Sequence, residues 1–201
     1  WLNNQKFNDT LKNNLKSDSV VLDYGCGVGW ALMEAYHTVN FMKGIGIDTS
    51  NNAIETANKI KDLSNLTNLS FFCGDVKELN TYQNYFDFII SINTIDVIPD
   101  EIGEKIIDYL YKSLKANGKI FIGMNPIFSP VEMTELLKMT KVGNYYYKDG
   151  IMRCNYKKMD EWKKMFDKYF IIEDEGEFVL SEKEEKYPRR MFLLSKKNII
   201  K

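Results

Sequence analysis

The segment that decides the fold is Asp23-Tyr24-Gly25-Cys26-Gly27-Val28-Gly29. It ends an apolar run, residues 19–24, that is typical of a buried strand, and it precedes a helical pattern over residues 30–42. Three alternate glycines allow a tight turn and let a ligand lie against main-chain amides. The segment therefore predicts a strand, a ligand-binding turn and a helix in succession.

Two common phosphate-binding motifs are absent from this turn. A dinucleotide fingerprint, GxGxxG, needs a third glycine at position 30, but that residue is Trp30, whose indole would obstruct the close approach of helix and strand. A Walker phosphate loop needs Gly-Lys-Ser/Thr after the glycines, and none follows. The turn thus lacks the main residues for binding a nicotinamide or flavin dinucleotide or a nucleoside triphosphate.

Short apolar strands alternate with helical patterns along the first two thirds of the chain. Further strands are expected at residues 44–48, 69–73, 86–92 and 119–124. A helix is expected to begin at Pro99 and to end at Asn117-Gly118, with a buried stripe of Ile102, Ile106, Leu110 and Leu114. This alternation predicts an α/β fold, with a doubly wound, mostly parallel sheet and helices on both faces.

The pattern changes after residue 124. We expect residues 125–155 to form an insertion that caps the substrate site, and residues 170–180 and 191–195 to pair as an antiparallel hairpin at the sheet edge. We predict a single domain over residues 1–201, with residues 1–18 as an N-terminal helical segment.

Polar residues follow successive strands of the predicted sheet. Asp48 ends the second strand, where its carboxylate can accept both hydroxyls of a ribose. Asp75 follows the third strand and can accept a hydrogen bond from an exocyclic amine, and Asn93 follows the fourth. Because the carboxyl ends of parallel strands meet at one edge, we expect these groups and the glycine turn to line one crevice.

The chain resembles the class I S-adenosylmethionine-dependent methyltransferases in the order and spacing of VLDYGCGVG, GIGID, FFCGDV, FDFIISINTIDVIPD and LKANGKIFI. The resemblance implies a Rossmann-like sheet of seven strands, the last of them antiparallel. It also implies S-adenosylmethionine as cofactor and S-adenosylhomocysteine as product. The residues it implies for cofactor binding are Asp23, Gly25, Cys26, Gly27, Asp48, Thr49, Asp75, Val76 and Asn93.

The implied reaction is in-line methyl transfer to an oxygen or nitrogen atom of a small molecule. Many relatives have a histidine four residues beyond the position of Asn93, but this chain has Val97 there, so the neighbouring Asp96 is the candidate catalytic residue. Asp96 also fits a simple role as an acid at the start of a helix. No (Asn/Asp)-Pro-Pro-(Tyr/Phe/Trp) motif follows the fourth strand, which argues against methylation of adenine or glutamine amino groups.

Candidate substrate-binding residues lie in the insertion: Tyr145, Tyr146, Tyr147 and Arg153. The tyrosines fit equally well a role in sealing the insertion onto the sheet.

Composition narrows the choice of partners. Lysine and arginine number 27 against 28 acidic residues, and the net charge of −1 argues against nucleic acid or an acidic membrane surface as partner. No apolar run approaches the ~18 residues that a membrane helix needs. The 3 cysteines have no CxxC spacing, so we expect reduced thiols in a cytoplasmic protein, with no metal site.

Two other functions fit parts of this pattern. One is a non-catalytic protein that binds the cofactor and acts as a structural or activating partner. The other, disfavoured by Trp30 and by the lack of a Tyr-x-x-x-Lys pair, is a nicotinamide-dependent oxidoreductase. The sequence leaves the methyl acceptor and the oligomeric state open.

Overall fold

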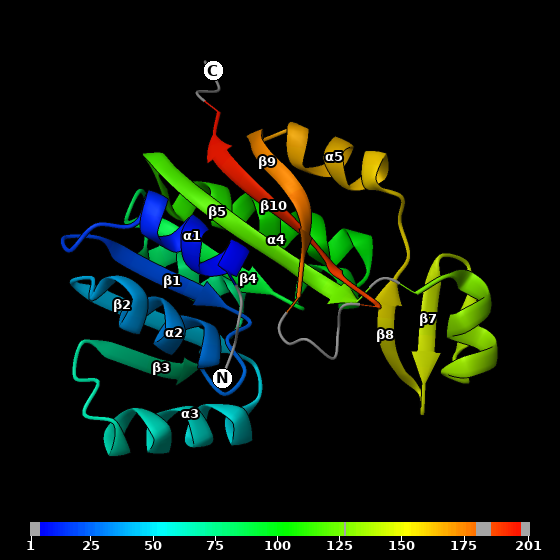
Figure 1. Cartoon of the computed structure of the whole chain (residues 1–201), viewed down its shortest axis with the longest axis horizontal. Coiled ribbons are helices and arrows are strands. Elements are labelled where there is room, and N and C mark those ends of the chain that lie inside the picture. Colours follow the sequence, from blue (N-terminus) through cyan, green and yellow to red (C-terminus); the bar gives the residue numbers. More distant parts are fainter. Residues whose placement is uncertain (1–4, 127, 180–185, 198–201) are drawn as a thin grey trace.

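The computed structural model describes residues 5–126, 128–179 and 186–197 and shows a seven-stranded sheet (Figure 1). In spatial order the strands are β3 (Leu69–Cys73), β2 (Lys43–Asp48), β1 (Val20–Tyr24), β4 (Phe86–Ile92), β5 (Leu114–Pro126), β10 (Arg189–Lys196) and β9 (Phe170–Phe178). The first five are parallel, and β10 is antiparallel to both of its neighbours. The predicted doubly wound sheet with an antiparallel last strand is confirmed.

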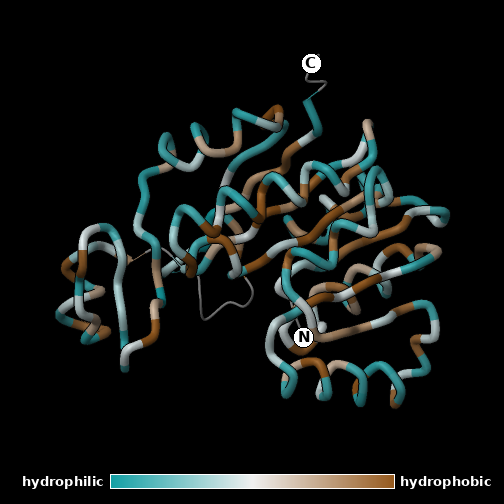
Figure 2. Tube along the Cα trace, turned by 180° about the vertical axis from the view of Figure 1, so that it is seen from behind, coloured by the Kyte–Doolittle hydropathy of each residue, from teal (hydrophilic) through white to brown (hydrophobic). Residues whose placement is uncertain are grey.

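Helices cover both faces of this sheet (Figure 1). They are α1 (Gln5–Asn14), α2 (Trp30–Val39), α3 (Asn51–Leu63), α4 (Asp100–Ser113) and α5 (Met159–Asp167). Side chains alternate along each strand, so Val21 packs in the layer under α1, α2 and α3, whereas Leu22 packs in the layer under α4 and α5. Hydrophobic segments accordingly concentrate in the central strands of the trace (Figure 2).

Helix α4 is shorter than the sequence predicts. It ends at Ser113, and Asn117-Gly118 lies inside β5 instead of closing the helix. The carbonyls of Lys112 and Ser113 accept hydrogen bonds from the amides that lead into β4, which ends the helix one residue before Leu114 pairs with Phe86. The predicted buried stripe also loses its first member, because Ile102 is 49% exposed.

The predicted insertion forms a small layer beside the carboxyl end of β5 (Figure 1). We call residues 128–155 the cap. It contains one turn of π-helix, η3 (Glu132–Leu136), and a three-stranded antiparallel sheet of β6 (Thr140–Val142), β7 (Tyr145–Lys148) and β8 (Ile151–Asn155).

Buried polar contacts anchor the cap to the start of α4. The side-chain amide of Asn155 donates hydrogen bonds to the Ile98 carbonyl and to the Asp100 carboxylate. Lys157 is buried, pairs with the same carboxylate, and its Nζ lies 4.9 Å from the ring centre of Trp162. The cap is therefore joined to the segment that follows β4.

The predicted N-terminal helical segment contains α1, which packs on the sheet. Phe7 is fully buried, and its ring centre lies 5.0 Å from that of Phe121 in β5. All three cysteines are free, as expected, and no helix in the described ranges is long and apolar enough to cross a membrane.

Candidate functional site

Two cavities lie where the parallel strands end. The first, which we call the sheet cleft, has a volume of about 440 Å³ and follows the ends of β1, β2, β3 and β4. The second, which we call the cap pocket, has a volume of about 770 Å³ and lies between the ends of β4 and β5, the cap and β10. Asn93 and Val97 line both cavities, so the two meet at the end of β4.

The glycine turn forms one wall of the sheet cleft. Gly25 has a φ of +76°, and a Cβ atom at this position would collide with the side chain of Thr94. The amides of Gly25 and Cys26 both donate to the carbonyl of Ile47, at 2.8 and 3.1 Å. The turn is thereby fixed to the neighbouring strand, and position 25 accepts only glycine.

Asp48 is tied to the backbone on both sides. One carboxylate oxygen accepts a hydrogen bond from the Gly27 amide at 2.8 Å, and the other accepts one from the Ser50 amide at 2.8 Å. Each oxygen keeps a second lone pair, so the carboxylate can still accept hydroxyl groups from a ligand in the cleft. Asp48 thus both shapes the cleft and lines it.

Six of the nine residues predicted to bind the cofactor line the sheet cleft: Gly25, Asp48, Thr49, Asp75, Val76 and Asn93. Asp75 also caps the 3₁₀-helix η1 (Val76–Thr81) by accepting a hydrogen bond from the Lys77 amide at 2.7 Å. Gly27 is held by Asp48 beside the cleft, and Cys26 is buried below it, where burial raises the pKa of its thiol.

Asp23 lies beneath the glycine turn with only 1% of its surface exposed. Its Oδ2 atom has no hydrogen-bond partner among the described residues. Burial raises the pKa of Asp23 to about 7; the Leu32 amide lowers it, and the charge of Asp48 raises it. The carboxylate therefore changes charge near neutral pH, directly behind the cleft.

One part of the cleft is apolar and was not predicted from the sequence. Ile98, Ile102 and Ile106 lie opposite the polar strand ends and line the cavity. Ile102 leaves the core stripe of α4 because it faces this cavity. The helical periodicity of the sequence does not distinguish a side chain that packs on the sheet from one that faces an adjoining cleft.

Asn93 connects the two cavities. Its backbone has a φ of +57°, a left-handed conformation that asparagine tolerates. Its backbone amide donates a hydrogen bond to the Gly123 carbonyl at 2.8 Å. Its side-chain oxygen accepts a hydrogen bond from Arg189 at 2.7 Å. Both contacts reach strands that are distant in sequence, and they fix the side chain where the cavities meet.

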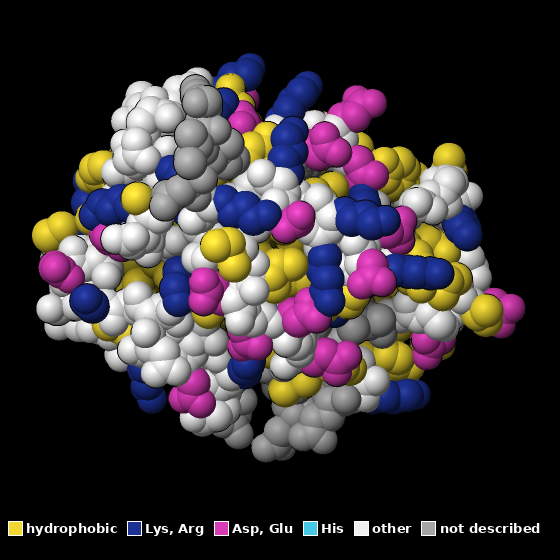
Figure 3. Space-filling model, turned by 90° about the horizontal axis from the view of Figure 1, so that it is seen from above, with side chains coloured by type: hydrophobic (Ala, Val, Ile, Leu, Met, Phe, Trp, Pro, Cys, Tyr) yellow, Lys and Arg dark blue, Asp and Glu magenta, His cyan; other side chains and the backbone are white. Residues whose placement is uncertain are grey.

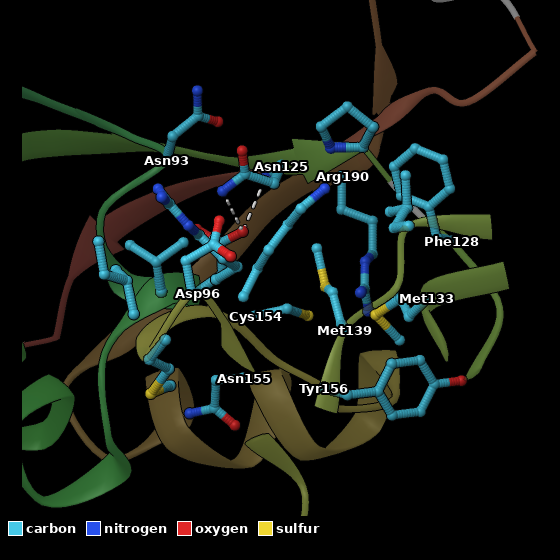
Figure 4. Close-up of a pocket in the computed structure, with 18 residues that line it drawn as sticks. Asn93, Asp96, Asn125, Phe128, Met133, Met139, Cys154, Asn155, Tyr156 and Arg190 are labelled. Carbon is cyan, nitrogen blue, oxygen red and sulfur yellow. Dashed lines mark hydrogen bonds between the residues drawn. The ribbon is translucent and has the colours of Figure 1, made fainter. Parts of the chain in front are cut away.

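Asp96 lies in the cap pocket, on the single 3₁₀ turn η2 (Ile95–Val97). Its Oδ2 atom accepts hydrogen bonds from the backbone and side-chain amides of Asn125, at 2.7 and 3.1 Å (Figure 4). Its Oδ1 atom is buried and has no partner in the described part of the chain. Burial raises the pKa of Asp96, although the Asn125 hydrogen bonds and the charge of Arg190 act in the opposite direction. Asp96 is therefore a buried carboxylate that lines the cap pocket, and it also lies in the first turn of a short helix.

The rest of the cap pocket is mainly apolar. Its apolar wall consists of Pro126, Phe128, Met133, Leu137, Met139, Ile151 and Met152. Cys154 and Tyr156 add a thiol and a ring, and burial raises the pKa of Cys154 to about 11, so the thiol is neutral at pH 7. Arg190 lines the pocket from β10, and its Nε atom has no hydrogen-bond partner among the residues described.

Of the residues predicted to bind substrate, Arg153 lines the cap pocket. Tyr145, Tyr146 and Tyr147 are not among the described residues that line either cavity. They form β7, where Tyr146 is fully buried, and the Tyr145 hydroxyl accepts a hydrogen bond from the Asp100 amide at 3.4 Å. The tyrosines thus build the cap and anchor it. The described ranges contain no group of three or more potential metal ligands.

Comparison with known proteins agrees with this geometry. A family described as a methyltransferase domain matches residues 15–176. The demethylmenaquinone methyltransferase of Oceanobacillus iheyensis is 28% identical over 114 residues, which are 56% of this chain and 47% of that protein. The chain spans less than half the length of the first curated relatives that it matches.

Solved structures show the same fold at low sequence identity. A protein from Pyrococcus horikoshii OT3 superposes with a TM-score of 0.70 at 21% identity, covering 97% of this chain and 93% of that one. An S-adenosylmethionine-dependent methyltransferase from Clostridium acetobutylicum gives a TM-score of 0.69 at 18% identity, covering 95% of this chain and 91% of that one.

Proposed function

Since this chain belongs to the methyltransferase-domain family, we propose that it is an S-adenosylmethionine-dependent methyltransferase acting on an oxygen or nitrogen atom of a small molecule. One observation carries the proposal: the sheet cleft and the cap pocket meet at Asn93 and Val97. A cofactor in the cleft and an acceptor in the pocket would face each other there. A non-catalytic cofactor-binding protein would not need a second cavity at this junction.

The residues of the sheet cleft fit the cofactor. Asp48 can accept hydrogen bonds from the ribose hydroxyls, and Asp75 can accept one from the exocyclic amine of the adenine. The adenine ring would fit against Val76 and Ile102. Gly25 leaves the space beside Thr94 that any side chain would fill. When bound, the cofactor supplies a methyl group already activated by a sulfonium.

Much of the work of this chain is then alignment and exclusion of water. Asn93, held by Arg189, fixes the passage between the cavities. Asp96 is the residue we assign to accept a proton from the acceptor, because it is the buried carboxylate on the pocket side of that passage. A raised pKa suits this role, since a general base works best near the operating pH.

A small-molecule acceptor is favoured over a nucleic acid. Lysines and arginines are interspersed with acidic residues on the face seen in Figure 3 and form no basic stripe there. The cap pocket has the size of a small-ligand cavity. The demethylmenaquinone methyltransferase relative is named for a small-molecule substrate.

Calorimetric titration with S-adenosylmethionine and S-adenosylhomocysteine tests the proposal. We expect wild-type protein to bind both and Asp48→Asn to bind each about tenfold to a hundredfold more weakly, because a charge-assisted acceptor is lost. Asn is preferred to Ala because it keeps the size of the side chain and one of the two acceptors that hold Gly27 and Ser50, whereas Ala would lose both.

The matched control is Asp62→Asn, at the exposed end of α3, which should bind like wild type. Titration with NADH should give no binding. Wild-type protein that binds NADH but neither S-adenosylmethionine nor S-adenosylhomocysteine would overturn the proposal in favour of an oxidoreductase.

A further inference from the structure

We propose, on the basis of the function proposed above, that the acceptor is an apolar ring compound with an acidic hydroxyl, a phenol or an enol. Asp96 takes the proton of that hydroxyl, and Arg190 supplies a positive charge to the oxygen. Three features of the cap pocket support this inference: its apolar wall, the polar side chains beside Asp96, and the charges that line it.

The wall selects an apolar body. Three methionines, Met133, Met139 and Met152, line the pocket with Phe128 and Leu137. Unbranched thioether side chains adapt to the outline of a flat or irregular apolar ligand and make favourable contacts with aromatic rings. Asn93, Asp96 and Asn125 lie at the end that adjoins the sheet cleft (Figure 4), and further polar side chains of the cap and β10 line the pocket elsewhere. A ligand that matches this lining has a polar group beside Asp96 and Asn125 and an apolar body against the methionines.

The polar end selects a hydrogen-bond donor. Both Asn125 hydrogen bonds go to Oδ2 of Asp96, and Oδ1 is left buried without a described partner. A buried acceptor without a partner is costly, so turning Oδ1 toward the pocket to meet a ligand hydroxyl gains a hydrogen bond that an ether could not supply. Val97, which follows Asp96, lines both cavities, so this hydroxyl would lie beside the passage to the methyl donor.

The charge selects an oxygen rather than an ammonium group. Lys148, Asp149 and Arg153 line the pocket from exposed positions, where water screens their charges, so the charges that matter are those of Asp96 and Arg190. The positive charge of Arg190 acts on Asp96, and it would equally stabilise an oxygen that becomes negative as its proton leaves. An ammonium ligand beside Asp96 would be repelled by Arg190, which is half-buried in the same wall. A neutral amine already has a free lone pair, so it needs no base before it attacks.

The chemical step balances with these residues. The hydroxyl proton passes to Oδ1 of Asp96, and an oxygen lone pair forms the new bond to the methyl carbon. The sulfur–methyl bond breaks, and its electron pair stays on sulfur, which becomes a neutral thioether. The products are a methyl ether and S-adenosylhomocysteine, and Asp96 later releases its proton to water.

Three probes that share one ring test the acceptor class without the cofactor: 2-naphthol, 2-methoxynaphthalene and 2-naphthylmethylammonium. We expect wild-type protein to bind 2-naphthol at least about tenfold more tightly than either other probe. Asp96→Asn should abolish the preference for naphthol over the ether, whereas Asp108→Asn, on the surface of α4, should retain it.

A second variant does not depend on Asp96. Met139 is half-buried in the pocket wall, so Met139→Glu adds a carboxylate with little disturbance of the core. It should shift the preference from naphthol toward the ammonium probe by about tenfold. Val131→Glu, at a position 60% exposed on the cap, is the matched control and should leave the preference unchanged.

Turnover supplies an independent readout. With S-adenosylmethionine present, 2-naphthol should be converted to 2-methoxynaphthalene, and Asp96→Asn should lower the rate about a hundredfold and remove the rising limb of the pH–rate profile. Cofactor affinity should not change in this variant. Naphthol that binds no better than the other probes overturns the acceptor class, even where the cofactor binds. A naphthol preference without cofactor binding overturns methyl transfer instead.

Discussion

The sheet cleft and the cap pocket are built in different ways. In the cleft, Asp48 accepts hydrogen bonds from the backbone amides of Ser50 and of Gly27 in the glycine turn. Asp75 accepts one from the backbone amide of Lys77, two residues further along the chain. In the cap pocket, Asp96 and Arg190 come from segments almost a hundred residues apart, and each retains a buried polar atom without a described partner. The cleft is preorganised by the sheet itself, whereas the pocket depends on how the cap and β10 meet the end of β4.

This difference predicts separate responses to mutation. Changes in the glycine turn should affect cofactor binding and leave the cap pocket intact. Changes in the anchor of the cap should weaken ligand binding in the cap pocket and leave cofactor binding unchanged. Variants on each side can therefore test whether the two cavities are independent binding units.

The largest effect is expected at Gly25. Gly25→Ala places a Cβ against Thr94 and forces a side chain into a φ of +76°, so we expect no measurable binding of S-adenosylhomocysteine by calorimetry. Gly143→Ala is the matched control, because Gly143 has a φ of +60° but no atom within 4 Å of the added Cβ. The control should lose some stability and bind normally. If both variants bind equally well, the glycine turn is not part of the site.

The contrast also explains what the sequence could predict. Asp48 and Asp75 were predictable because Asp48 ends one strand and Asp75 lies two residues after the next, and the parallel pairing of these strands brings them together. The position of Ile102 could not be predicted, because only the packed structure shows that one side of α4 faces the cleft. The end of α4 was missed for a similar reason: the amides of Asn84 and Tyr85, not the local Asn-Gly signal, terminate it.

The cap pocket was less predictable still. Residues 125–155 were expected to form the cap, but the tyrosine triplet, its most conspicuous feature, builds β7 instead of the pocket wall. The wall comes from methionines that have no sequence motif. Arg190 joins it only because β10 is antiparallel to β5 and brings residue 190 to the carboxyl end of that strand.

A smaller effect, and a pH-dependent one, is expected at Asp23. Burial raises its pKa from the ordinary value of 3.8 to about 7 in the folded chain, so the folded state holds the proton over a range where the unfolded state has lost it. The stability associated with this proton is fully present below pH 4 and is lost as the pH rises to about 7. Relative to Asp23→Asn, the free energy of unfolding of wild-type protein should fall by about 2.5 kcal/mol between pH 5 and pH 8.

Urea unfolding at these two pH values measures that difference. The same ionisation should strengthen binding of the positively charged S-adenosylmethionine above pH 7, because a carboxylate behind the cleft attracts it. Asp23→Asn should show neither trend. A parallel pH dependence in both proteins would assign the titration to another group.

The smallest effect is expected at the anchor of the cap. Lys157→Met keeps an apolar stem over Trp162 but removes the ion pair with Asp100, whose side chain is 39% exposed. We expect a loss of about 1–2 kcal/mol, less than for a fully buried pair because water partly solvates the remaining carboxylate. Lys112→Met, which breaks the exposed pair with Asp108, should cost less than about 0.5 kcal/mol. Loosening the anchor should weaken binding of 2-naphthol in the cap pocket and leave S-adenosylhomocysteine binding unchanged. If both ligands weaken together, the cap supports the sheet cleft as well, and the two cavities form one cooperative site.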